Sequence, residues 1–117
     1  MDVDSVAERI RDLKIQGASN IAKAALKAYD SAEYKSSAVK KLVAARPTEP
    51  MLRNVLKLAE TEPVEQILGR LASDYDSLVR FGVSKLRRYD AIYTHCHSST
   101  VMKIIKALRP KVVYVTE

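Results

Sequence analysis

The sequence predicts a mainly α-helical bundle followed by a β-α-β unit that begins an α/β domain. Two observations indicate this fold class. Apolar residues recur at helical spacing through residues 1–89, interrupted only where prolines or a glycine separate the segments. From residue 90 onward, two short runs rich in β-branched residues flank one amphipathic segment. We therefore expect a helical N-terminal domain over residues 1–89 and a first β-α-β unit over residues 90–117.

Composition predicts a cytoplasmic protein with a real hydrophobic core. A chain of 117 residues that is 47% apolar fits one ordinary domain. No run of 18 uncharged apolar residues is present, and the opening "MDVDSVAERIRDLK" lacks the apolar core of a signal peptide, so no membrane association is expected. Cys96 is a single cysteine, which rules out an internal disulfide and fits a reducing compartment.

The net charge of +6 raises the question of nucleic-acid binding. Basic residues are spread at helical spacing and alternate with acids, and only "KLRRY" (85–89) and "KALRPK" (106–111) are locally dense. No basic strand with interleaved aromatic residues is present to stack bases. We therefore do not expect direct nucleic-acid binding, and a phosphate or an acidic protein explains the charge more simply.

The first two helices are expected on either side of a break at "IQGASN". The segment "VDSVAERIRDLK" has one apolar face, and Gly17 is its predicted stop. Ser19 or Asn20 is the predicted N-cap of the second helix. This second helix has a narrow face of small residues, which we expect to pack against the next helix, "KSSAVKKLVAA".

Two further helices follow the turn "RPTEP" (46–50), whose two prolines cannot lie inside one helix. The segment "EPMLRNVLKLAE" predicts the fourth helix. The segment "VEQILGRLASDYDSLVRFGVSKLRRY" predicts a fifth of about 25 residues, or roughly 38 Å at 1.5 Å per residue. A helix of that length usually forms the spine of a bundle.

The last part of the chain predicts a parallel pair of strands. "DAIYTHC" and "PKVVYVT" are the strands, and "SSTVMKIIKAL" is the crossover helix between them. Two parallel strands are not viable alone, and "VVYV" leaves an exposed apolar edge. We therefore expect a partner chain, a second copy or a further C-terminal part to complete the sheet.

The stretch "THCHSST" (94–100) allows three interpretations. It could supply metal ligands, but neighbouring strand residues point to opposite faces, and the chain has no other Cys or His to complete a set of four, so no metal is expected. Cys96 could instead be simply buried, with the two histidines as satisfied polar groups. In the third interpretation, the strand ends at Cys96, and the amides and hydroxyls of the following helix N-terminus hold an anion.

Three motifs together resemble one known family. They are "IQGASNIAKAA" (15–25), "ARPTEPMLRNVL" (45–56) and "YTHCHSSTV" (93–101), and in order and spacing they are similar to the initiation factor 2B α/β/δ-related superfamily. This superfamily includes isomerases of ribose-1,5-bisphosphate and methylthioribose-1-phosphate, and the archaeal members look most similar. The resemblance implies a helical domain followed by a Rossmann-like domain, in an oligomer, of which this chain has only the N-terminal part.

The resemblance also implies site residues. Cys96 matches the cysteine that acts in proton transfer, and Arg46 matches an arginine that binds substrate phosphate. Gly17 and Ala18 match a substrate-contacting loop, in which Gln16 stands where the isomerases commonly have arginine. Arg46 could instead only cap the preceding helix, and Gly17 only stop one. The family's second catalytic group, an aspartate, belongs to its C-terminal domain, so this chain alone is expected to be inactive.

Two functions of different classes follow from the resemblance. The leading hypothesis is a non-catalytic initiation factor 2B-like subunit that acts by protein binding and assembly, with initiation factor 2 as the partner in eukaryotic members. The alternative is the N-terminal portion of a ribose-1,5-bisphosphate isomerase that binds a sugar phosphate and needs no cofactor. A chain without activity of its own is the third possibility.

Overall fold

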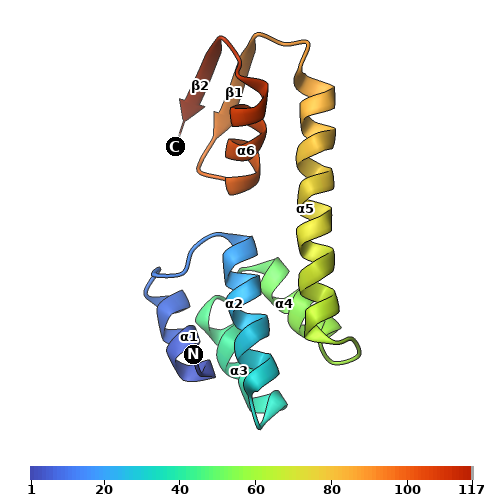
Figure 1. Cartoon of the computed structure of the whole chain (residues 1–117). Coiled ribbons are helices and arrows are strands. Elements are labelled where there is room, and N and C mark those ends of the chain that lie inside the picture. Colours follow the sequence, from blue (N-terminus) through green and yellow to red (C-terminus); the bar gives the residue numbers. More distant parts are fainter. Residues whose placement is uncertain (117) are drawn as a thin grey trace. The chain divides into compact units, whose positions relative to one another are not determined.

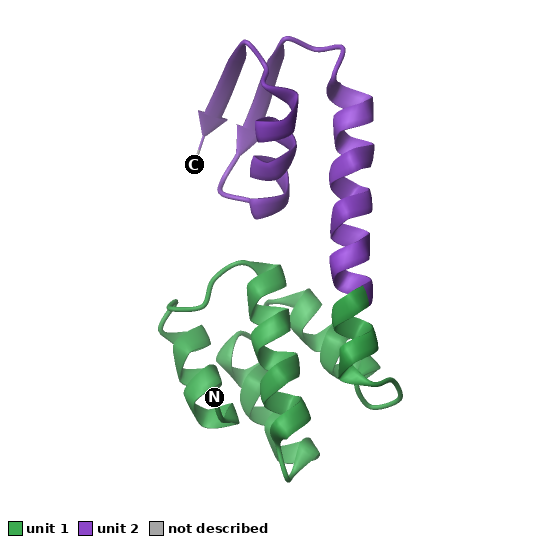
Figure 2. Ribbon diagram, in the orientation of Figure 1, with its two compact units in different colours: residues 1–69 green, residues 70–117 purple. Residues whose placement is uncertain are grey.

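The computed structural model describes residues 1–116 of the chain and consists of six helices and two strands in that range (Figure 1). The chain divides into two compact units, Met1–Gly69 and Arg70–Glu117 (Figure 2). The division falls within helix α5 (Val64–Leu86). The predicted domain boundary at residues 89 and 90 coincides with the change from helices to the β-α-β segment, and it stays a prediction.

The first unit is a helical bundle, as the sequence predicted. It contains α1 (Val3–Arg11), α2 (Ala18–Ser31), α3 (Lys35–Ala45), α4 (Pro50–Leu58) and the first turns of α5. The largest fully buried side chains of the described residues all lie in this unit: Ile10, Ile21, Leu26, Leu42, Leu52, Leu56 and Ile67. Burial of these seven side chains, each worth roughly 1.5–3 kcal/mol, is the main term that stabilises this unit.

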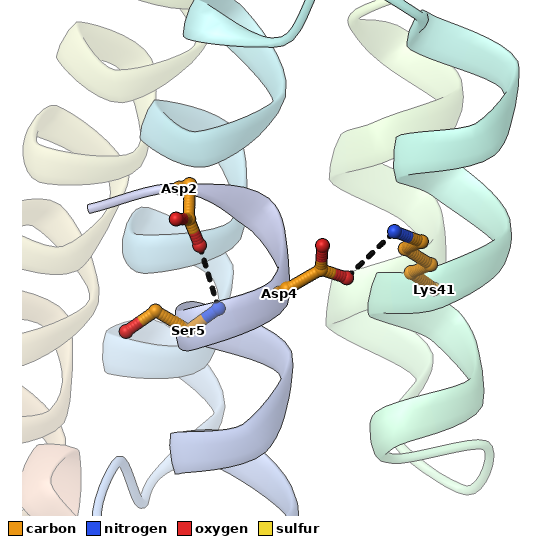
Figure 3. A network of polar contacts seen from close by, with 4 residues as sticks. All are labelled: Asp2, Asp4, Ser5 and Lys41. Carbon is orange, nitrogen blue, oxygen red and sulfur yellow. Dashed lines mark hydrogen bonds and ion pairs between the residues drawn. The ribbon is translucent and has the colours of Figure 1, made fainter.

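Polar contacts fix the start of α1 on the bundle (Figure 3). The carboxylate of Asp2 accepts a hydrogen bond from the backbone N–H of Ser5 at 2.8 Å and thereby caps the helix. Asp4 forms an ion pair with Lys41 of α3 at 2.6 Å. Both partners are largely exposed, so the ion pair orients α1 against α3 and contributes little stability.

The break between α1 and α2 differs from the prediction. α1 ends at Arg11, because Leu13 takes a left-handed φ of 59° and the N–H groups of the next two residues both donate to the Arg9 carbonyl. Gly17 does not stop α1; it is the N-cap of α2, in place of Ser19 or Asn20.

The small-residue face of α2 also packs differently from the prediction. α2 packs mainly against α4 and α1, and less against the adjacent α3. The next helix in the sequence is therefore not its main neighbour, because the turn after α3 brings α4 back onto α2.

The second unit contains the rest of α5 and a β-α-β segment, which confirms the predicted parallel pair. β1 (Ala91–His95) and β2 (Val112–Thr116) are joined through α6 (Ser99–Leu108). The strands are parallel and in register from Ala91 opposite Val112 to His95 opposite Thr116. The described residues thus form a two-stranded sheet.

The two faces of this sheet have different surroundings. On one face, Thr94, Val113 and Val115 line a cavity together with residues of α6. The other face bears Tyr93, His95, Tyr114 and Thr116, because side chains alternate along a strand. Every residue of β2 is exposed, including the apolar ones.

Among the described residues, no helix combines the length and the apolar character that crossing a bilayer requires.

Gly82 lets α5 and α6 approach closely within the second unit, and this contact gives a test of the fold. A Cβ at Gly82 would lie 2.6 Å from Cδ1 of Ile104, whereas a Cβ at Gly69 would meet nothing within 4 Å. We expect Gly82→Ala to stabilise the protein less than Gly69→Ala does, because the added methyl group must displace Cδ1 and Cγ1 of Ile104, which offsets the gain in helix propensity.

Gly69→Ala is the matched control in the same helix, and it should stabilise the protein by up to about 1 kcal/mol. Adding Ile104→Val, which removes Cδ1, should relieve part of the crowding in Gly82→Ala. Urea unfolding measures all four proteins. Equal stabilisation by alanine at both glycines would contradict the close packing of α5 on α6.

Candidate functional site

The stretch "THCHSST" lies where β1 ends and α6 begins. β1 ends at His95, and Cys96 then takes a left-handed φ of 60°, which is uncommon for a residue with a side chain. The N–H of Cys96 donates to the carbonyl of Thr116 at 2.8 Å, so the backbone pairing continues one residue past the strand. Ser98 is the N-cap of α6, and its Oγ accepts from the N–H of Val101 at 3.3 Å.

Cys96 opens into a cavity of about 260 Å³ between the sheet and α6. The thiol is exposed, and His97 and Ser98 lie beside it in the cavity lining. The rest of the lining is mainly apolar: Thr94, Val101, Met102, Ile105, Val113 and Val115. A thiol, an imidazole and a hydroxyl thus line one part of an otherwise mainly apolar cavity, which is an arrangement typical of small-molecule sites.

The geometry separates the three interpretations of this stretch. The interpretation of Cys96 as a buried residue is wrong, because its side chain is exposed. The turn at Cys96 brings His97 to the same cavity, whereas His95 belongs to the other face of the sheet. Within residues 1–116, no three His, Cys, Asp or Glu side chains lie close enough together to hold a metal ion. The strand end and the helix N-terminus adjoin, as the third interpretation requires.

His95 is held by a polar network on the face of the sheet opposite the cavity. Its Nδ1 lies 2.9 Å from Oγ1 of Thr116, and the hydroxyl of Tyr93 lies 3.1 Å from the same oxygen. No motif in the sequence indicates this role for Thr116. The register of the two strands, which sets His95 opposite Thr116, is the signal that could have indicated it.

The predicted phosphate-binding residues lie in the first unit. Gly17 has a φ of 84°, which favours glycine, and makes no side-chain cap, while Ala18 is the first residue of α2. Both residues and Gln16 are exposed. The side-chain amide of Gln16 donates to the carbonyl of Leu13 at 2.7 Å, and its backbone carbonyl accepts from Asn20 at 3.1 Å. Gln16 therefore closes the turn before α2.

Arg46 is the C-cap of α3 and starts the turn to α4. Its N–H donates to the carbonyl of Val43 at 3.2 Å, and its own carbonyl accepts from Glu49 at 3.2 Å. These are backbone contacts. Over residues 1–116, neither a hydrogen bond nor an ion pair engages the half-buried guanidinium, so this group is free for an anion. Nothing joins it to Gln16, Gly17 or Ala18 in the part of the chain that the structure describes.

Comparison with known proteins gives a consistent set of relatives, although no protein-family profile matches the chain. The ribose 1,5-bisphosphate isomerase of Methanocaldococcus jannaschii is 30% identical over 125 aligned residues, which cover 85% of this chain and 40% of that protein. The chain thus spans about 40% of the length of this curated relative.

Two solved structures share the fold. The 5-methylthioribose 1-phosphate isomerase of Pyrococcus horikoshii superposes with a TM-score of 0.67 at 20% identity, over 96% of this chain and 43% of the other. The translation initiation factor eIF-2B subunit delta of A. fulgidus superposes with a TM-score of 0.57 at 17% identity, over 97% and 46%.

The class defined by these comparisons is the one that the motifs indicated. The isomerases and the factor subunit match the initiation factor 2B α/β/δ-related superfamily, which confirms the resemblance over the part of these proteins that the chain spans. One individual relative, the ribose 1,5-bisphosphate isomerase of Methanocaldococcus jannaschii, shares 30% of its aligned residues with this chain.

The left-handed backbone at Cys96 gives a test of the site geometry. Alanine pays roughly 1–2 kcal/mol in this region of φ and glycine does not, so we expect Cys96→Gly to be more stable than Cys96→Ala by about 1 kcal/mol. In ordinary strands and helices alanine is the more stable of the two.

Arg109, with a φ of 51° at the C-cap of α6, is the matched control. Arg109→Gly should likewise be more stable than Arg109→Ala. Thermal or urea unfolding of the four variants measures the order. If Cys96→Ala were as stable as Cys96→Gly, the left-handed turn at the site would be disproved.

Proposed function

We propose that this chain forms the N-terminal part of a sugar-phosphate isomerase site, with Cys96 as a proton-transfer group. The observation that carries the proposal is the exposed thiol of Cys96, held at the carboxyl end of a parallel strand beside the N-terminus of α6. Ligands of α/β sheets bind at this end of the strands. The relationship to a ribose 1,5-bisphosphate isomerase at 30% identity supports the same class of substrate.

The chemistry explains the need for a second group. An aldose–ketose isomerisation removes a proton from one carbon and returns one to its neighbour, so an acid and a base act together. Cys96 is one such group. By the resemblance, the second is an aspartate in the C-terminal part of the relatives, which are more than twice as long as the shared stretch. We therefore expect activity only when that part is present.

Arg46, Gly17 and Ala18 are the proposed phosphate contacts, with Gln16 in a supporting role. The guanidinium of Arg46 offers the planar fork that suits phosphate. The first N–H groups of α2 have no partner within the helix and lie at its positive end. Gln16 lacks the charge of an arginine, and one N–H of its side-chain amide already donates to Leu13, which leaves one N–H for an anion. Its supporting role is to shape the loop and to offer this single donor.

A second candidate function is a non-catalytic factor 2B-like subunit that acts by protein binding. The exposed apolar strand β2 favours it, because Val112, Val113, Tyr114 and Val115 are each at least 37% exposed. Such an edge pairs readily with another chain. The partner would be a protein such as initiation factor 2, or a second copy of this chain in an oligomer. Either function fits the cytoplasm, where a single thiol stays reduced.

Ligand binding tests the isomerase proposal. Ribose 1,5-bisphosphate at about a hundredfold excess over its Kd should raise the melting temperature by roughly 10 °C, because binding to the folded state adds about 2.7 kcal/mol. Arg46→Ala should abolish the shift. Arg80→Ala removes an exposed arginine from α5 and is the control that should keep it. The protein tested is the wild-type chain joined to the C-terminal part of a relative. If ribose 1,5-bisphosphate left its melting temperature unchanged, the proposal would be contradicted.

Binding to a protein partner tests the second candidate. The chain, immobilised at its N-terminus, should retain purified initiation factor 2 on a biosensor surface. Val115→Lys should weaken this binding at least tenfold, because it places a charge on the exposed β2 edge. Lys41→Ala, on α3 of the other unit, is the control variant. Self-association in analytical ultracentrifugation without binding of the factor would favour a second copy as the partner.

A further inference from the structure

Thr116, in β2, makes three contacts: two with side chains of β1 and one with the backbone of Cys96, the residue that follows β1. Its carbonyl accepts the N–H of Cys96 at 2.8 Å. Its Oγ1 lies 2.9 Å from Nδ1 of His95 and 3.1 Å from the hydroxyl of Tyr93. Thr116 therefore contacts Tyr93 and His95, the last two side chains on that face of β1. It also holds the backbone N–H of Cys96, just beyond the end of β1.

The side chains of Thr116 and Cys96 lie on opposite faces of the sheet. The hydroxyl of Thr116 lies on the open face, whereas the thiol of Cys96 lines the cavity on the α6 face. Tyr93 can donate to Thr116, which then donates to Nδ1 of His95; in the reverse order, His95 donates to Thr116, and Thr116 to Tyr93. In both orders, the one hydroxyl of Thr116 is both donor and acceptor. The network is therefore complete only with a hydroxyl at this position.

We propose that Thr116 is a positioning residue that fixes the left-handed turn at Cys96. His95 and Thr116 are the last pair of the ladder among the described residues, and bonds at the end of a ladder open easily. Cys96 also occupies a region of φ that costs free energy, so its backbone relaxes unless neighbouring contacts hold it. The side-chain bonds of Thr116 to Tyr93 and His95 keep β2 in register with β1, and the Thr116 carbonyl then holds the Cys96 amide.

This inference rests on the proposed function only for its catalytic meaning. If Cys96 transfers a proton, Thr116 sets the direction in which the thiol faces the substrate, without touching the substrate. The positioning of Cys96 itself is a property of the described residues and can be measured without any substrate.

Three variants separate the hydroxyl of Thr116 from its backbone. Thr116→Val removes both side-chain bonds and keeps the shape and the strand preference of the residue. Thr116→Ser keeps the hydroxyl. Tyr93→Phe removes one bond at a side chain that is 69% exposed, so it has little effect on folding.

The first measurement is amide hydrogen exchange at Cys96 by NMR. In Thr116→Val we expect exchange about three- to tenfold faster, as for the loss of one ordinary hydrogen bond. Thr116→Ser should exchange at the wild-type rate, and Tyr93→Phe should lie between. The second is the ¹⁵N chemical shift of His95 Nδ1, which should change in Thr116→Val and return in Thr116→Ser. The third is alkylation of Cys96 by iodoacetamide, which as the single cysteine gives one mass shift, and it should be faster in Thr116→Val.

Unchanged exchange at Cys96 in Thr116→Val, or the same increase in Thr116→Ser, would overturn the positioning role. The result is independent of the proposed function, which ligand binding tests separately. If Thr116 controls Cys96 while ribose 1,5-bisphosphate fails to bind, the isomerase proposal fails and the positioning role stands. If the ligand binds while Thr116→Val leaves Cys96 unchanged, the positioning role fails and the isomerase proposal stands.

Discussion

The parallel pairing of β1 with β2 is the constraint on which the candidate site depends. Parallel strands need a crossover connection, and here the crossover is α6, so the helix must begin just after β1 ends. The three residues between them, from Cys96 to Ser98, have to reverse the chain direction. A left-handed residue at Cys96 makes a reversal of this length feasible, and Ser98 closes it with an N-cap. The topology of the strands and α6 therefore sets the position of the thiol without any ligand.

The same pairing gives the two faces of the sheet different chemistry. Because side chains alternate, Thr94 and Cys96 share the α6 face with Val113 and Val115, while Tyr93, His95 and Thr116 share the other. The two histidines of "THCHSST", though only two residues apart, come to different surroundings: His97 joins Cys96 at the cavity and His95 pairs with Thr116. This separation explains why the two histidines and the cysteine do not gather into a metal site among the described residues.

Much of the fold follows from the sequence because periodicity and turn residues are local signals. The bundle, the turn at "RPTEP" and the strand-helix-strand order were predictable from them. The start of α2 was not, because two N-cap residues, Ser19 and Asn20, were available and the left-handed Gly17 took the position instead. That choice depends on the turn at Leu13, which is held by contacts to the Arg9 carbonyl and has no signature in the sequence. The role of Thr116 was equally hidden, because it arises only when strands 20 or more residues apart come into register.

The distribution of burial explains why either proposed function requires a further surface. In the first unit, α1 to α4 each contain buried side chains, whereas α6 contains none and β2 is exposed along its whole length. Parallel sheets are stable when both faces and the edges are covered, so the face of Tyr93 and Tyr114 and the edge of β2 are incomplete in the described residues taken alone. A further part of an isomerase and a partner chain of a factor complex would satisfy the same requirement. The position of Cys96 at the end of β1 therefore links its chemistry to whatever covers the sheet.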